Sequence, residues 1–193
     1  MLEERRRILN QALADADPEV RRAAAAALEK LDAALGLDRL LAMLREGSRG
    51  QRVQAIQALE PIDSDRVFPP LLQSLADPDA DIRAAAVQTL GRKKNPKVIG
   101  SLIKHLQDPH PAVRVHAAEA LGQFSDRRLV PYLARHLGGA DTELAQSAIR
   151  SLGRIGGPEA EKHLLPLMQD PRPAIRRATA EALGALAVEQ PSV

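Results

Sequence analysis

The sequence predicts an all-α solenoid, and three observations lead to this prediction. The first is an internal repeat of 31 residues, visible in DPDADIRAAAVQTLG (77–91), DPHPAVRVHAAEALG (108–122) and DPRPAIRRATAEALG (170–184). The second is that each copy contains two stretches whose apolar residues recur at helical spacing. The third is that turn residues separate these stretches. Neither helix can bury its apolar stripe alone, so the helical hairpins must stack on one another.

The repeat keeps its register over six copies without insertion or deletion. One column of equivalent positions is leucine in every copy: Leu28, Leu59, Leu90, Leu121, Leu152 and Leu183. A second column is also leucine throughout: Leu9, Leu40, Leu71, Leu102, Leu133 and Leu164. We therefore expect one domain over residues 1–187, with copies at about 2–32, 33–63, 64–94, 95–125, 126–156 and 157–187, followed by a C-terminal tail at 188–193.

The first helix of each copy carries an apolar stripe such as Leu102, Ile103 and Leu106. The second helix begins at a column of N-cap residues, which are Asp17, Ser48, Asp79 and Asp141. Proline follows in several copies at the first helical position, where its missing N–H costs nothing. Turn signals such as KKNP (93–96) and GGP (156–158) separate the copies.

Small residues mark where neighbouring second helices approach each other. One column reads Ala24, Ala55, Ala86, Ala117, Ala148 and Thr179. Another column is glycine in four copies, at Gly91, Gly122, Gly153 and Gly184. A glycine inside a helix costs about 1 kcal/mol relative to alanine. Its recurrence at one position therefore predicts a backbone contact with the next copy or with an approaching helix end.

Composition excludes several classes of function. The chain of 193 residues has no cysteine, which excludes disulfides, thiolate metal sites and cysteine nucleophiles. Aromatic residues are only 2%, so a binding surface must work through charge, polar groups and shape. The net charge of +2 gives no sign of a protein that binds polyanions as a whole. Neither a signal peptide nor a membrane span is visible, and we expect a cytoplasmic protein that does not enter membranes.

The chain resembles the HEAT repeats, and specifically the short bacterial HEAT-like repeats of the PBS-lyase (E-Z) type. The residues that show it are the D-x-x-x-x-(V/I)-R motif and the A-L-G that follows, as in Asp77 to Gly91. The resemblance covers essentially the whole chain and implies a right-handed α-solenoid of about six HEAT-like hairpins. It also implies that Asp and Arg of the motif form a hydrogen-bonded ladder through the stack. The rungs would be Asp15–Arg21, Asp77–Arg83, Asp108–Arg114 and Asp170–Arg176, with Glu46–Arg52 as a variant.

Two copies depart from this pattern. Copy five has Gly139 and Ala145 at the ladder positions, so we expect its rung to be missing. Copy two replaces the proline turn with EGSRGQR (46–52). We expect these copies to form the softest joints. At the ends, Arg6 and Glu161 replace the apolar residues of the middle copies, which suggests a capped array, although Leu183 and Leu186 leave the C-terminal end less polar.

The resemblance places the second helices on the concave side, where their outward positions vary between copies. We expect a partner protein or peptide to bind there. The candidate residues are Gln88, Arg92, His116, Glu119, Gln123, Arg150, Arg154 and Glu181. An ordinary solvated helix face would vary in the same way. The sequence leaves the oligomeric state open, with a monomer as the default.

Two alternative functions remain open. The first is an accessory subunit of a modifying enzyme, similar to the bilin lyase subunits. The second, less favoured, is nucleic-acid binding through the basic edge formed by Arg92, Lys93, Lys94, Lys97 and Lys104. No aromatic residue interleaves with these cations to stack on bases.

Neither catalysis nor a cofactor is expected. No Ser-His-Asp order, P-loop or glycine-rich phosphate fingerprint occurs. His105 and His136 occupy equivalent positions in neighbouring copies, but two imidazoles without a third ligand make a poor metal site. The di-iron enzyme deoxyhypusine hydroxylase is built on HEAT-like repeats with His-Glu pairs, and this chain contains no His-Glu dipeptide.

Overall fold

The structure is a computed structural model that describes residues 1–186, and these form eleven α-helices and four short 3₁₀-helices with no strand. The all-α class is confirmed. The chain divides into two compact units, Met1–Ala55 and Ile56–Val193, which we call the N-terminal and C-terminal units. The tail expected at 188–193 lies outside the described residues. Within residues 1–186, no helix combines the length and the apolar character that crossing a membrane requires.

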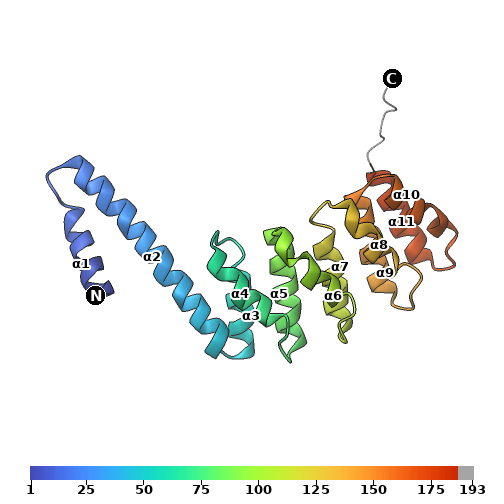
Figure 1. The fold of residues 1–193 in the computed structure, drawn as a ribbon, viewed down its shortest axis with the longest axis horizontal. Helices are drawn as coiled ribbons and strands as arrows, with labels where there is room; N and C mark the ends of the chain where they lie inside the picture. The colour runs from blue at the N-terminus through green and yellow to red at the C-terminus, as the bar shows by residue number, and fades with distance from the viewer. Residues whose placement is uncertain (187–193) are drawn as a thin grey trace, which may run out of the picture. The chain divides into compact units, whose positions relative to one another are not determined.

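The N-terminal unit contains one unexpectedly long helix. Helix α1 (Leu2–Ala12) packs against α2 (Pro18–Glu46), and α3 (Arg49–Ala58) runs across the boundary between the units (Figure 1). Helix α2 has 29 residues and continues without a break through the expected hairpin turn between copies one and two. The expected boundary at residues 32 and 33 is therefore wrong at the level of secondary structure.

The reason lies in one column of the repeat. In later copies the equivalents of Ala33 are the N-caps Ser64, Asn95 and Asp126, whose side chains accept the N–H group two residues further on. Alanine offers no acceptor, and Ala33 and Ala34 are the strongest helix formers. Nothing in the local sequence stops the helix, so α2 continues through the position of the turn.

The C-terminal unit is a regular stack of hairpins. The first helix of each copy begins with a 3₁₀ turn or a proline. These helices are η1 (Asp65–Val67) with α4 (Phe68–Ser74), η2 (Pro96–Val98) with α6 (Ile99–His105), η3 (Arg127–Leu129) with α8 (Val130–Ala134), and α10 (Pro158–Leu164) with η4 (Leu165–Gln169). The second helices are α5 (Ala80–Lys93), α7 (Pro111–Leu121), α9 (Thr142–Ile155) and α11 (Pro173–Ala185).

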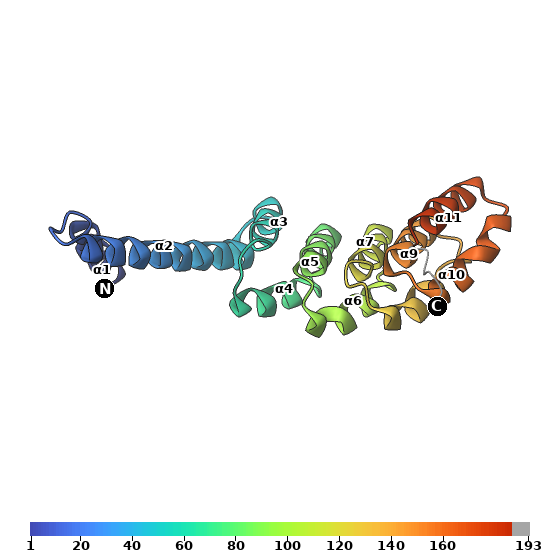
Figure 2. The same ribbon diagram turned by 90° about the horizontal axis from the view of Figure 1, so that it is seen from above.

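Within this unit the helices form two rows. Helices α5, α7, α9 and α11 lie side by side in one row, and α4, α6, α8 and α10 form the other (Figures 1 and 2). The core lies between the rows and contains both leucine columns. Leu90, Leu121 and Leu152 are fully buried, as are Leu102 and Leu133. This is the solenoid arrangement that the repeat predicts, and it places the outward faces of the second helices next to one another.

The glycine column is where neighbouring second helices touch. A Cβ added to Gly91 would lie 2.5 Å from the Cβ of Ala120. The equivalent atom at Gly122 would lie 2.5 Å from Ser151 Oγ, and at Gly153 it would lie 2.9 Å from the Cβ of Ala182. A side chain does not fit at any of these three positions. The expected backbone contact between copies is confirmed there.

The ladder links each copy to the next through arginine. Arg83 Nη1 donates to the main-chain oxygens of Asp77 (2.9 Å) and Pro78 (3.1 Å) in its own copy. Its Nε and Nη2 each lie 2.8 Å from the carboxylate of Asp108 in the next copy. The arginine thus binds the turn of its own copy through carbonyl groups and the next copy through a bidentate ion pair. Arg114 repeats both halves of this arrangement, with the carbonyls of Asp108 and Pro109 on one side.

In copy five, residues at neighbouring positions form the ladder contacts that Gly139 and Ala145 cannot form with their side chains. Arg114 donates to the carboxylate of Asp141, two residues beyond Gly139, through Nη2 at 2.5 Å and Nε at 3.2 Å. Ala145 cannot donate, but Arg172 of copy six donates to Gly139 O (2.8 Å) and to the Asp170 carboxylate (2.9 Å). These two acceptors occupy the same columns as Asp77 O and the Asp108 carboxylate. The expectation that copy five has no rung is therefore wrong.

At the two ends of the array, the arginines keep the contact within their own copies. Arg21 Nη1 donates to Asp15 O (2.6 Å) and Ala16 O (2.9 Å), and Arg176 Nη1 donates to Asp170 O (2.8 Å) and Pro171 O (3.1 Å). In the variant copy, Arg52 Nε donates to Leu44 O at 3.2 Å, two residues before Glu46.

Candidate functional site

A polar hollow opens on the outward face of three consecutive second helices. Helices α5, α7 and α9 hold their side chains in register because the glycine contacts fix the helix spacing. The hollow has a volume of about 230 Å³ and is lined by Gln88, Arg92, His116, Glu119, Ala120, Gln123 and Arg154. Six of the eight candidate binding residues therefore lie around one cavity. We call this cavity the polar hollow.

His116 of α7 lies at the centre of a hydrogen-bond chain across the hollow. The side-chain amide nitrogen of Gln88, on α5, lies 3.0 Å from the ring nitrogen Nε2. The other ring nitrogen, Nδ1, lies 3.1 Å from Glu119 Oε2. The same amide nitrogen also lies 3.0 Å from Nδ1. The contacts with Gln88 and Glu119 are both satisfied when Nε2 accepts from the amide and Nδ1 donates to the carboxylate. The chain links two neighbouring copies.

Glu119 extends the chain to α9. Its Oε1 lies 3.5 Å from the hydroxyl of Ser147, which is fully buried, and 3.7 Å from Arg150 Nη2. Arg150 Nη2 also donates to Ser147 Oγ at 2.8 Å. The hydrogen bond from His116 lowers the pKa of Glu119 and outweighs burial, and the nearby arginines Arg150 and Arg154 lower it further. The carboxyl group is therefore ionised at neutral pH.

Two arginines border the hollow in different states. Arg92 at the end of α5 pairs with Glu60, with Nη1 2.6 Å from Oε2. Arg154 at the end of α9 is exposed, and its guanidinium group makes no hydrogen bond or ion pair with any residue in the described part of the chain. Arg154 is thus a cation available to a ligand.

The remaining two candidates lie elsewhere. Arg150 is joined to the hollow through Glu119 but does not line it. Glu181 lies on α11, where its carboxylate is 3.9 Å from Arg177 Nε. Ala120 lines the hollow and was not among the candidates. It is the small residue against Gly91, it is buried, and its position in the packing column gave no sign that it also lines the hollow.

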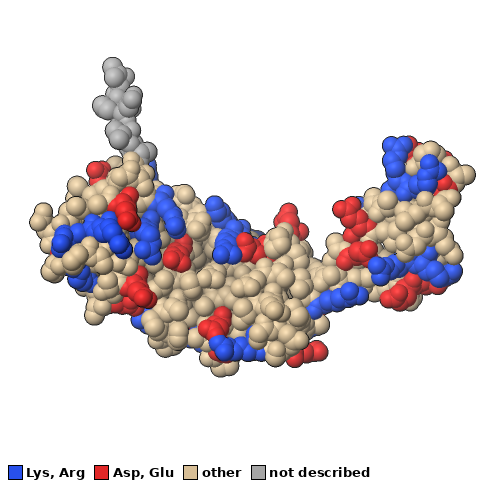
Figure 3. Space-filling model, turned by 180° about the vertical axis from the view of Figure 1, so that it is seen from behind, with Lys and Arg blue, Asp and Glu red and all other residues tan. Residues whose placement is uncertain are grey.

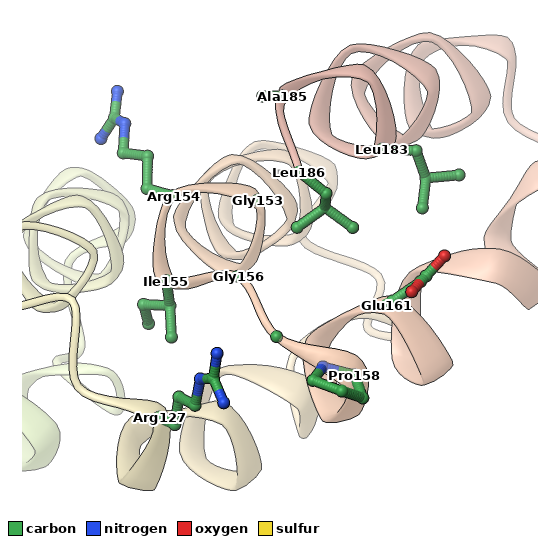
Figure 4. Close-up of a pocket in the computed structure, with 11 residues that line it drawn as sticks. Arg127, Gly153, Arg154, Ile155, Gly156, Pro158, Glu161, Leu183, Ala185 and Leu186 are labelled. Carbon is green, nitrogen blue, oxygen red and sulfur yellow. The ribbon is translucent and has the colours of Figure 1, made fainter. Parts of the chain in front are cut away.

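A second hollow lies at the other side of Arg154. It has a volume of about 500 Å³ and is bordered by Arg127 at the start of η3, the C-terminal end of α9, the Gly156–Gly157 turn, α10 and the end of α11 (Figure 4). Its walls combine aliphatic side chains such as Ile155, Leu183 and Leu186 with Glu161. Arg154 projects from the end of α9 away from the turn (Figure 4). Sequence reasoning missed this hollow because its residues come from five separate segments.

The basic edge is partly used within the fold. Lys93 Nζ donates to Ile62 O at 2.7 Å and lies 5.8 Å from the centre of the Phe68 ring. Burial lowers the pKa of Lys93 despite the carboxylates of Asp63 and Glu60 nearby. Basic and acidic side chains are interspersed on the face of the C-terminal unit that Figure 3 shows. The edge therefore offers fewer free cations than its sequence suggests.

The two histidines considered as metal ligands have other surroundings. The ring nitrogens of His105 lie 2.8 Å from Ser101 O and 3.0 Å from Leu75 O. Burial lowers the pKa of His136, and Arg114 and Arg135 lower it further. Among the described residues, no three or more histidine or carboxylate side chains gather in a way that could hold a metal ion.

Comparison with known proteins supports the repeat assignment. Residues 68–143 and 136–192 match a family model described as HEAT repeats. A search of curated proteins finds no match to the sequence.

Solved structures with a similar fold are repeat proteins. One is the complex of CpcE and CpcF of phycocyanin lyase from Nostoc sp., with 22% identity and a TM-score of 0.66; the match covers 78% of this chain and 65% of that one. YibA of Escherichia coli has 18% identity and a TM-score of 0.61, with 94% and 72% covered. A designed armadillo repeat protein in complex with a (KR)4 peptide has 18% identity and a TM-score of 0.59, with 93% and 98% covered. This chain thus spans about two thirds of the length of the phycocyanin lyase chain.

Proposed function

Because the chain belongs to the HEAT-repeat family, we propose that it is a non-catalytic interaction module that binds a segment of a partner protein in the polar hollow. The observation that supports this proposal most is the convergence of six polar side chains on one cavity, five from α5, α7 and α9 and the sixth, Gln123, from the turn after α7. These side chains vary between copies, whereas the columns that stack the copies stay small or apolar. Variation confined to one face over a constant core is the pattern of a surface adapted to a ligand.

The charges of the hollow indicate the kind of segment that binds. Arg92 and Arg154 lie on its border, Arg150 lies behind it, and the carboxylate of Glu119 is already engaged by His116 and Arg150. A segment that brings a carboxylate to Arg154 gains a charge-assisted hydrogen bond without breaking an existing pair. Gln88 and Gln123 can each donate to and accept from the main chain of the same segment. We therefore infer a partner segment with at least one Asp or Glu.

Reversing the available charge tests the proposal. Partner proteins captured by the wild-type chain from its host are identified by mass spectrometry, and the affinity of the strongest partner is then measured by calorimetry. Arg154→Glu should raise the Kd at least tenfold, because two carboxylates would then face each other. Arg177→Glu on α11 is the matched control, since Arg177 is also exposed and lies outside the hollow. Equal affinities of both variants and the wild type would refute the assignment of the hollow.

A second candidate function is an accessory subunit of a modifying enzyme of the bilin lyase kind. The second hollow supports it, since aliphatic walls beside Arg154 would suit a flat apolar molecule with acidic substituents. Mixing the purified chain with a free tetrapyrrole and recording its absorbance tests this candidate. A shifted absorption band that Leu183→Glu abolishes would favour it over the interaction module.

A further inference from the structure

We propose that the two ends of the repeat array bind each other head to tail, so that copy one of one molecule stacks on copy six of a second molecule of this chain. This association uses surfaces away from the polar hollow and does not depend on the proposed function. Three features that join neighbouring copies inside the C-terminal unit recur at the end of copy six, where they have no partner within residues 1–186. Copy one carries corresponding features that also have no partner in that part of the chain.

The first unused feature is half of a ladder rung. Arg176 binds the two carbonyl oxygens of its own turn as Arg83 does, through Nη1 at 2.8 and 3.1 Å. Inside the stack, the Nε and Nη2 of Arg83 bind the Asp108 carboxylate of the next copy. The Nε and Nη2 of Arg176 have no acceptor among the described residues, although the side chain is held in the same way by its Nη1. A carboxylate from another molecule would complete the rung.

The second unused feature is a glycine against which a small residue of another helix can pack. Gly91, Gly122 and Gly153 each receive an alanine or serine of the next second helix. Gly184 holds the same column on α11, and no described residue lies within 4 Å of the position that its Cβ would take. Only a small residue could approach the backbone there as closely as Ala120 approaches Gly91.

The third unused feature is apolar. One column of the first helices reads Leu44, Leu75, Leu106 and Leu137, and these side chains are only 3% to 6% exposed. Met168 holds this column in copy six and is 36% exposed. The nearby Leu165 is 54% exposed. The end of copy six therefore presents the kind of surface on which an inner copy stacks.

Copy one presents the complementary set. Asp15 Oδ1 accepts the N–H of Asp17 at 2.9 Å, the turn geometry that Asp108 makes with the N–H of His110 at 2.8 Å. Unlike Asp108, the Asp15 carboxylate is exposed and pairs with no cation among the described residues. Ala27 holds the column of Ala120 and Ser151, and Leu13 holds the column of Met168 and is 41% exposed.

These correspondences identify the occupant as a second copy of this chain. Asp15 and Ala27 have the same spacing as Asp108 and Ala120, so one docking geometry brings the carboxylate to Arg176 and the small residue to Gly184 together. The Arg176 guanidinium on copy six and the Asp15 carboxylate on copy one carry opposite charges. A contact between two different surfaces of identical molecules is heterologous, and it continues into chains or rings unless its geometry closes a ring.

Sedimentation velocity over a range of protein concentrations tests the proposal. The wild type should show a weight-average mass that rises with concentration and falls with added salt. Gly184→Leu should abolish the rise. Because no described residue lies against Gly184 and leucine is the better helix former, this variant should fold at least as well as the wild type. Gly100→Leu, at another helical glycine with open surroundings, is the matched control and should associate as the wild type does.

Asp15→Asn tests the other end, since asparagine keeps the acceptor for Asp17 and removes the charge. It should raise the Kd of association about tenfold. A mixture of Gly184→Leu and Asp15→Lys should form heterodimers, because the first variant keeps a normal copy one and the second keeps a normal copy six. A wild type that stays monomeric at every concentration would overturn the proposal. So would association that survives Gly184→Leu, which would place the contact on another surface.

Discussion

In the C-terminal unit, the leucines of both repeat columns are fully buried from Leu59 to Leu164 and only Leu183 is half-buried. In the N-terminal unit, Leu28 is buried, but Leu9 and Leu40 are only half-buried. Both units carry the same 31-residue repeat. They differ at the glycine column, where Gly91, Gly122 and Gly153 have the counterpart Glu29 in the N-terminal unit; the counterpart in copy two, Glu60, lies just inside the C-terminal unit. A glutamate side chain prevents the close helix contact that a glycine allows, so the leucine columns by themselves do not produce tight stacking.

The turns between copies differ as well. Three of the four first helices of the C-terminal unit begin at Ser64, Asn95 and Asp126, whose side chains cap them, and the fourth begins after Gly157, whereas Ala33 leaves α2 uninterrupted. The stacked copies thus combine a turn that ends the preceding helix with a small residue at the contact between second helices.

Of the changes considered, the removal of a buried ion pair of the ladder should lower the free energy of unfolding most. In Asp108→Ala, Arg83 loses its carboxylate partner while its side chain stays only 12% exposed, so the free energy of unfolding should fall by about 4 kcal/mol. Chemical denaturation followed by circular dichroism measures this, and hydrogen exchange of the α5 and α7 amides locates it. Asp15→Ala in the N-terminal unit should cost only about 1 kcal/mol, the loss of one exposed turn hydrogen bond. Equal losses would mean that the rung does not distinguish the units.

Restoring the turn should break the long helix. Ala33→Asp with Ala34→Pro recreates the cap and proline of Asn95 and Pro96, and proline inside a helix costs about 3 kcal/mol. Because the chain has no cysteine, spin labels can be attached specifically at Lys30→Cys and Arg39→Cys. A continuous helix separates these backbone positions by about 13 Å. The double substitution should change and broaden the measured distance. Ala34→Gly, as a control, should leave it unchanged.

A side chain added at the glycine column should lower the stability only where neighbouring second helices touch, which is in the C-terminal unit. Gly91→Leu places a Cβ 2.5 Å from the Cβ of Ala120 and 2.9 Å from its Cα, so α5 and α7 must separate at a cost of about 2 kcal/mol. Thermal unfolding measures the loss. Gly184→Leu should instead gain up to about 1 kcal/mol, since it fills open space on a helix. A Gly91→Leu variant as stable as the wild type would show that the close contact is not required.

Acid should weaken the ladder gradually. Burial alone would raise the pKa of Asp108, but the hydrogen bonds from Arg83 and the His110 N–H outweigh it, and the net pKa is lowered. The pKa of Asp141 is lowered in the same way by Arg114, and Arg172 lowers that of Asp170 to about 2. Groups with lowered pKa stabilise the fold above about pH 4, and this contribution is lost as the pH falls toward 2. Denaturation midpoints at pH 7 and pH 3 should therefore differ, and Asp108→Asn should narrow the difference.

Much of the fold and part of the site could be predicted from the sequence. The apolar columns determine which face of each helix is buried, because burial depends on spacing along a helix and on residue type, and both are local properties. The same spacing placed Gln88, His116 and Glu119 on the outward face, and the structure brings them into contact. The sequence also contains the reason why α2 is continuous, because Ala33 occupies the column in which later copies have a helix-capping side chain. The regular 31-residue repeat, however, predicts a turn at that position.

Only the tertiary structure decided how the ladder is completed and where the hollows lie. Arg172 takes the place of the arginine missing at Ala145 because its guanidinium reaches the same two acceptors from the opposite side, a relation that no fixed spacing encodes. Within residues 1–186, Arg154 has no ion-pair partner at the polar hollow, whereas Arg92 is paired with Glu60 from the preceding copy. A repeat fixes the direction in which side chains point. Which of them meet depends on distances between helices, and these are set by packing.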